Sequence, residues 1–110
     1  MLSLCLSVCD TVKPHVSLMP LSRRMAVGSS VRLECPAWGY AAPNISWYRD
    51  GRALDAAARL RVSQQGRVLT LTGVRLHDRA RYECTAVNEH GAASRSTLLR
   101  VTGLLLTLCH

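Results

Sequence analysis

The chain contains no phenylalanine, and aromatic residues make up only 5% of its 110 residues. Acidic residues are also few, since seven Asp and Glu stand against fourteen basic residues, thirteen of them arginine and one, Lys13, lysine. With so few aromatic rings, a hydrophobic core has to be built on Leu, Val and Ala, with Trp38, Trp47 and the three tyrosines as its large pieces. A chain of this length forms one domain around a single core.

The ends of the chain lack the features of functional segments. The apolar tail Leu104–Leu108 is far shorter than the roughly 20 residues that a transmembrane helix needs. Residues 1–12 are apolar, but they lack a basic segment at their start and a clear cleavage site, as in a poor signal peptide or the edge of a fragment. We expect residues 1–12 and 104–110 to lie outside a domain that covers residues 13–103.

Between these ends the sequence alternates in short stretches that are typical of half-buried strands. The clearest is residues 79–86, in which even positions are apolar or small and odd positions up to Glu83 are charged. Similar stretches occur at residues 31–35, 45–49, 59–62, 68–72 and 93–101, and a run at 16–19 is interrupted by Pro20, which suits an edge strand that breaks or changes sheet. Turn signals such as Asp50-Gly51 separate them, while residues 36–43 are expected to form a loop. Some seven or eight short strands spaced in this way predict an all-β, two-sheet antiparallel sandwich.

Two cysteines fall on inward positions of these strands. They are Cys35 and Cys84, and Trp47 is inward on a strand between them. A disulfide joining them would stabilise the fold by about 4 kcal/mol through the entropy of the unfolded chain, and Trp47 would pack on it. The chain has five cysteines, an odd number that leaves at least one thiol without an intramolecular partner and is high for an intracellular chain of this length.

One combination of residues is more specific than any of its parts. It consists of Cys35, Trp47, Leu71, the run Asp78-x-Ala80-x-Tyr82-x-Cys84 and the ending Ala86-x-Asn88-x-x-Gly91. In this combination the chain resembles an immunoglobulin-superfamily domain of the intermediate, or I-set, type, over roughly residues 13–103. Two positions depart from the family pattern, because Ala80 stands where Gly is usual and Ala41 where Pro is common. The resemblance implies a Greek-key immunoglobulin-like sandwich.

The resemblance also implies a role for each of these residues. Cys35 and Cys84 would form the core disulfide. The side chains of Trp47, Tyr82 and Leu71 would pack in the core. The hydroxyl of Tyr82 would bond to the backbone near Asp78. Asp78 itself would form a salt bridge with Arg59. All of these roles are structural.

The residues offer no constellation for catalysis or for a metal. His77 and Asp78 are adjacent, and adjacent side chains on an extended chain point apart, so they do not pair as a base and its orienting group. The remaining histidines are His15, His90 and His110. The spacing of Cys5 and Cys9 with the distant Cys109-His110 is not a familiar zinc pattern, and free thiols or intermolecular disulfides are the alternatives. We therefore predict that the chain is not an enzyme and binds no cofactor or metal.

Asn44-Ile45-Ser46 is a sequon for N-glycosylation. Because Ile45 is inward, Asn44 and Ser46 face solvent, so Asn44 is a glycosylation candidate. Together with the candidate disulfide, the sequon favours the secretory route.

Two outer faces are candidates for recognition. On one sheet the outward residues form an apolar group with an aromatic anchor, which is typical of an interface with a protein partner or a neighbouring domain, unless they are scattered ordinary surface residues: Tyr48, Thr85, Val87 and Leu98. On the other sheet a basic group could hold heparan sulfate or another polyanion, unless it is an ordinary solvated face: Arg32, Arg59, Arg61 and Arg67, with Arg75 and Arg79 also expected near its lower edge. Nucleic acid is not expected, because the basic residues are not clustered with stacking aromatics.

These observations predict a non-catalytic module of an extracellular, secreted or cell-surface multidomain protein. It would bind a protein partner or neighbouring immunoglobulin-like domains, or act as a spacer, as similar domains do in cell-adhesion molecules, receptor ectodomains and matrix proteins. One alternative is an intracellular, sarcomere-type structural domain in which the cysteines stay reduced. The other is a module that binds heparan sulfate or a similar polyanion.

Overall fold

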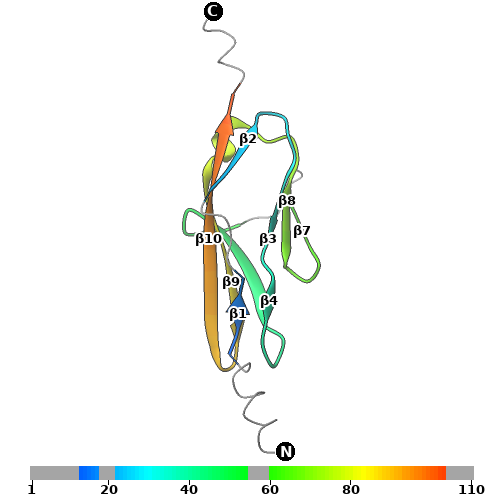
Figure 1. The fold of residues 1–110 in the computed structure, drawn as a ribbon, viewed down its shortest axis with the longest axis vertical. Helices are drawn as coiled ribbons and strands as arrows, with labels where there is room; N and C mark the ends of the chain where they lie inside the picture. Colours follow the sequence, from blue (N-terminus) through cyan, green and yellow to red (C-terminus); the bar gives the residue numbers. More distant parts are fainter. Residues whose placement is uncertain (1–12, 18–21, 55–59, 104–110) are drawn as a thin grey trace, which may run out of the picture.

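The strands form two layers that face each other across the core (Figure 1). The structure, a computed structural model, describes residues 13–17, 22–54 and 60–103. One layer is a five-stranded sheet in the order β2 (Ser22–Ala26), β10 (Gly91–Thr102), β9 (Ala80–Asn88), β5 (Asn44–Arg49) and β6 (Arg52–Ala53). The other is a three-stranded sheet in the order β3 (Val31–Glu34), β8 (Val68–Leu71) and β7 (Leu60–Ser63). The predicted all-β sandwich is thus confirmed.

Three short elements complete the described part of the fold. β1 (His15–Val16) pairs with β4 (Ala37–Trp38), and a single 3-10 turn, η1 (Leu76–Asp78), leads into β9. β1 and β2 belong to different sheets, as predicted for a first strand that changes sheet, while residues 18–21 between them lie outside the described part. Among the described residues, every strand pairing is antiparallel except that of β2 with β10, which is parallel.

The inward positions predicted from the alternation of apolar and polar residues form the core. In β3, Val31 and Leu33 are buried and the residues beside them are exposed, because successive side chains of a strand point to opposite faces. Cys35 and Cys84 form a disulfide across the two layers, and both are fully buried. Trp47 pairs with Cys84 in the register of β5 and β9 and is also buried.

The large aromatic residues do not all join this core. Trp38 is 47% exposed and Tyr40 is 69% exposed, so the expectation that they are large core pieces is wrong. In the two-residue strand β4 it is Ala37 that faces inward, and the ring of Trp38 points away and stacks on His15, with centroids 5.6 Å apart. The aromatic part of the buried core is therefore Trp47 and Tyr82.

Several elements differ from the predicted ones, among them β4, β10 and β2. β4 lies within residues 36–43, where a loop was expected, and β10 starts two residues before the predicted last strand and ends one residue after it. β2 was not predicted, because Ser22–Ala26 lacks apolar alternation, with Arg23 and Met25 half-buried and the other three residues exposed.

Candidate interaction surfaces

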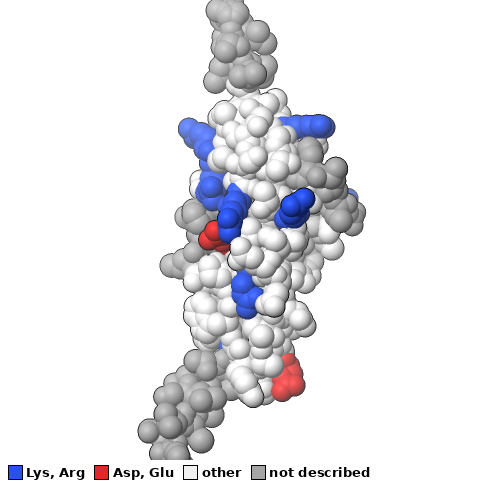
Figure 2. Space-filling model, turned by 90° about the vertical axis from the view of Figure 1, so that its right-hand side faces the viewer, with Lys and Arg blue, Asp and Glu red and all other residues white. Residues whose placement is uncertain are grey.

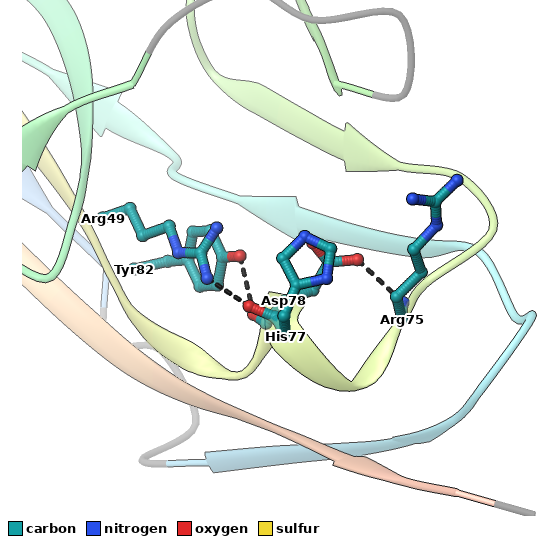
Figure 3. Close-up of polar contacts among 5 residues, drawn as sticks. All are labelled: Arg49, Arg75, His77, Asp78 and Tyr82. Carbon is teal, nitrogen blue, oxygen red and sulfur yellow. Dashed lines mark hydrogen bonds and ion pairs between the residues drawn. The ribbon is translucent and has the colours of Figure 1, made fainter.

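The corner before β9 is held by polar contacts of η1 (Figure 3). The buried hydroxyl of Tyr82 donates to the backbone oxygen of Asp78 at 2.8 Å, and Asp78 Oδ2 accepts from the backbone N–H of Arg75 at 2.8 Å. The Arg49 guanidinium donates to the His77 carbonyl, which ties the corner to β5. Asp78 is 3% exposed, so this network fixes the end of the sandwich rather than offering a reactive group.

Of the residues that the sequence offered for catalysis, for a salt bridge or for a metal, His77 and Asp78 lie at this corner. His77 Nε2 lies 3.9 Å from Asp78 Oδ1, while Arg59, the predicted salt-bridge partner of Asp78, lies outside the described residues. Among the residues that the structure describes, no three His, Cys, Asp or Glu side chains gather as they would around a metal ion. Cys5, Cys9, Cys109 and His110 also lie outside the described part.

The sequon lies at the start of β5, where Asn44 and Ser46 are exposed and Ile45 is half-buried. Asn44 pairs with Val87 in the register of β5 and β9, and Ser46 pairs with Thr85. Paired residues project from the same side of a sheet, so Asn44 shares a face with two residues of the predicted partner surface.

That predicted partner surface is divided by the register of the sheet. Tyr48, Thr85, Val87 and Leu98 share the outer face of the five-stranded sheet, and Val87 and Leu98 are 44% and 37% exposed. However, Val87 pairs with Ala92 while Leu98 pairs with Arg81, six residues or about 20 Å along β9. Tyr48 pairs with Glu83, and Thr85 lies between two serines, Ser46 and Ser94. The four side chains therefore do not form one apolar group, because polar residues separate them.

The predicted basic group on the three-stranded sheet is largely engaged with its neighbours. Arg32 and Arg61 both pair with Thr70 in the sheet register, but Arg32 Nε also lies 3.3 Å from Glu34 Oε2. Arg67 donates to the side chain of Gln65 and to the backbone oxygen of Ala37. Figure 2 shows this face, where basic side chains are spread out and an acidic one touches one of them. Arg59 is outside the described residues.

Sequence reasoning missed a second basic group, on the outer face of the five-stranded sheet. Arg24 pairs with Arg100 in the register of β2 and β10, and Arg79, Arg81 and Leu98 line the same shallow depression as Arg100. The alternation of Arg79 and Arg81 in the sequence was a signal that both point outward. Their proximity to Arg24 depends on strand pairing, which the sequence pattern does not give.

The two-layer sandwich, the buried disulfide with a tryptophan beside it and the tyrosine at the corner define a domain of the immunoglobulin type. The family model for the immunoglobulin I-set domain matches residues 14–101. The chain therefore belongs to this family.

Relatives and solved structures give the same result. The chain is 39% identical over 89 residues to hemicentin-2 of Mus musculus, covering 81% of this chain and 2% of that protein. It is 38% identical over 94 residues to neural cell adhesion molecule L1.1 of Danio rerio, covering 83% of this chain and 8% of that protein. The chain thus spans only a small part of the relatives that it matches.

Among solved structures, the tandem Ig repeats of Dlar match with a TM-score of 0.74 and 29% identity, over 82% of this chain and 48% of theirs. The titin M3 domain matches with a TM-score of 0.75 and 25% identity, over 83% of this chain and 98% of that domain. Within the described residues, the structure contains no helix with the length and apolarity that crossing a membrane requires.

Proposed function

We propose that the chain is a non-catalytic domain of an extracellular or cell-surface multidomain protein, in which it binds a protein partner or neighbouring domains, or holds them apart. The observation that carries this proposal is the disulfide between Cys35 and Cys84, both of them fully buried. Structural disulfides persist in oxidising compartments and are rare in the cytosol of mesophiles. The name of the relative from Danio rerio, a cell adhesion molecule, agrees with such a setting.

The path of the chain suits a place in a series of domains. β1 lies at one end of the sandwich and the last residues of β10 lie at the other (Figure 1). Neighbouring domains attached before β1 and after β10 would therefore follow one another along a line. The likeness to tandem Ig repeats supports this arrangement.

Glycosylation and partner binding would compete for one part of the surface. A glycan on Asn44 would cover Val87, its partner in the sheet register, and Thr85 beside it. Any protein contact through Val87 is therefore expected only in molecules that carry no glycan at Asn44. The outer face around Leu98 would stay accessible in both forms, since Leu98 pairs with Arg81 farther along the sheet.

The alternative is an intracellular structural domain in which the two cysteines stay reduced. The likeness to the titin M3 domain favours it, because that domain is matched over 98% of its length. The two proposals predict different cysteine chemistry in protein taken from its native source.

The test is mass spectrometry of peptides from unreduced, alkylated protein of native origin. We expect a peptide pair linked through Cys35 and Cys84, and a mass on the Asn44 peptide that a glycosidase removes. The same sample reduced before alkylation serves as the control, since both cysteines should then carry the alkyl group. Alkylation of Cys35 and Cys84 without reduction, together with an unmodified Asn44, would support the intracellular alternative and overturn the proposal.

A further inference from the structure

Four arginines project from the outer face of the five-stranded sheet around Leu98. Arg100 of β10 pairs with Arg24 of β2, and Leu98 pairs with Arg81 of β9 and with Ser22 of β2. Arg79, which directly precedes β9, lines the same shallow depression as Arg81, Leu98 and Arg100. All four arginines are exposed.

Three of these arginines lie in one row. The register of β9 and β10 places Leu98 opposite Arg81, and when it is extended by two residues it places Arg100 opposite Arg79. Because neighbouring strands lie about 4.8 Å apart, the row of Arg79, Arg100 and Arg24 spans about 10 Å across the sheet. Arg81 lies two residues from Arg79, about 7 Å along the strand.

No acidic side chain of the described residues pairs with the arginines of this row. Within the described part of the chain, none of the four guanidinium groups forms an ion pair or a side-chain hydrogen bond. The acidic residue in the depression is Asp50, whose Oδ1 accepts the backbone N–H of Arg81 at 2.9 Å. Like charges directly opposite each other in a sheet destabilise it, so an anion on the row would relieve repulsion as well as gain charge-assisted hydrogen bonds.

We propose that the row formed by Arg24, Arg79 and Arg100, with Arg81 beside it, binds a sulfated polysaccharide. The row lies on an open face rather than in a closed pocket, which suits a linear anion with repeated charges better than a single small anion. A protein partner fits less well, because a protein interface needs an apolar centre of substantial area. Leu98 is the exposed apolar side chain here, and the residues next along the face, Ser96 and Ser94, are small and polar.

The site differs from the basic group on the three-stranded sheet in how its charges are compensated. Arg32 is paired with Glu34, and Arg67 donates to Gln65 and Ala37, whereas the row has no such partners in the described residues. The two faces therefore supply a matched comparison within one molecule.

The experiment compares two triple variants of the full 110-residue chain, each of which lowers the net charge from +7 to +4 (7 − 3 = 4). The row variant carries Arg24→Gln, Arg79→Gln and Arg100→Gln, and the control, at the basic group of the three-stranded sheet, carries Arg32→Gln, Arg61→Gln and Arg67→Gln. Binding of a size-defined heparin oligosaccharide is measured by calorimetry at two salt concentrations. Elution from a heparin column is compared with elution from a sulfopropyl column of the same charge density.

We expect the unchanged chain to need more salt to leave the heparin column than the sulfopropyl column. The row variant should bind heparin at least about tenfold more weakly, since it lacks three charge-assisted contacts, and it should leave both columns at similar salt. The control variant should keep most of the heparin affinity and most of the difference in elution salt between the two columns. Thermal unfolding at low salt should show the row variant to be no less stable than the unchanged chain, because repulsion between opposed arginines is removed.

Equal losses of heparin affinity in the two variants would overturn the proposal, because binding would then depend only on net charge and not on the position of the arginines. Poly-glutamate bound as tightly as heparin would also overturn it, by showing that the row selects carboxylates and thus acidic protein segments. These outcomes leave the disulfide and the extracellular setting untouched, so a failure here is distinct from a failure of the proposed function.

Discussion

The indole N–H of Trp47 donates to the backbone oxygen of Gly66 at 2.7 Å and so joins the centre of the five-stranded sheet to the turn between β7 and β8. Gly66 has a φ of +91°, and a Cβ there would lie 2.8 Å from Cβ of Ile45, in the strand that carries Trp47. The turn and β5 therefore approach so closely that only glycine fits between them.

This close approach predicts that Gly66→Ala is unusually destabilising. The left-handed conformation alone costs about 1–2 kcal/mol for a residue with a Cβ, and the contact with Ile45 adds to it. Gly28→Ala is the matched control, because Gly28 has a φ of +93° and open space around it. Urea unfolding should show a larger loss of stability for Gly66→Ala than for Gly28→Ala, and equal losses would show that the turn can move away from β5.

The tyrosine at the corner gives a second prediction. Tyr82→Phe keeps the buried ring but removes the 2.8 Å hydrogen bond to the backbone oxygen of Asp78. We expect it to lower the free energy of unfolding by about 1–2 kcal/mol. Tyr40→Phe, at a residue that is 69% exposed, should change it by less than about 0.5 kcal/mol. If the two variants were equally stable in chemical denaturation, the corner bond would contribute nothing net.

Thr97 is a candidate for stabilisation. It is 2% exposed, it pairs with Tyr82 in the sheet register, and its hydroxyl has no hydrogen-bond partner among the described residues. Thr97→Val has nearly the same shape and removes this buried polar group. We therefore expect the free energy of unfolding to rise by about 1 kcal/mol. Thr97→Ser keeps the hydroxyl and loses the methyl group, and it should be less stable than the unchanged chain. A loss of stability in Thr97→Val would reveal a bond to ordered water.

The disulfide should dominate the stability of the domain. Cys35 and Cys84 are 49 residues apart in sequence, so their bond removes about 4 kcal/mol of entropy from the unfolded chain. The measurement uses a background in which Cys5, Cys9 and Cys109 are replaced by Ser, so that disulfides cannot exchange. Reduction of this protein should lower the free energy of unfolding by about 4 kcal/mol and move the urea midpoint to a lower concentration. A midpoint that does not respond to reduction would mean that packing around Trp47 alone holds the layers together.

Alternation in the sequence was enough to predict the inward residues that define the fold. Cys35, Trp47 and Cys84 lie on stretches with a clean period of two, and each is buried as that period requires. β2 escaped prediction because Ser22–Ala26 carries two arginines and one methionine rather than alternating apolar residues. Its place in the sheet comes from pairing with β10, which is a contact between residues 76 positions apart (98 − 22 = 76).

The candidate surfaces show the same limit. Strand parity correctly placed Val87 and Leu98 on the outer face, but it carries no information on how far apart they lie along the sheet. That distance depends on register, which is fixed by side-chain packing and turn geometry across the whole fold. For the same reason the opposition of Arg24 and Arg100 was invisible in the sequence. The salt bridge between Asp78 and Arg59 stays a prediction, because Arg59 is outside the described residues.

The parallel pairing of β2 with β10 has a mechanical consequence. The chain runs in the same direction through both strands, and it enters the sandwich at one end and leaves at the other (Figure 1). Tension applied between residues 13 and 103 would therefore load the five residue pairs of this ladder in shear, so that they would have to break together rather than one after another. In a single-molecule pulling measurement the domain should resist until one abrupt rupture, and a Pro substitution within β2 should lower that rupture force.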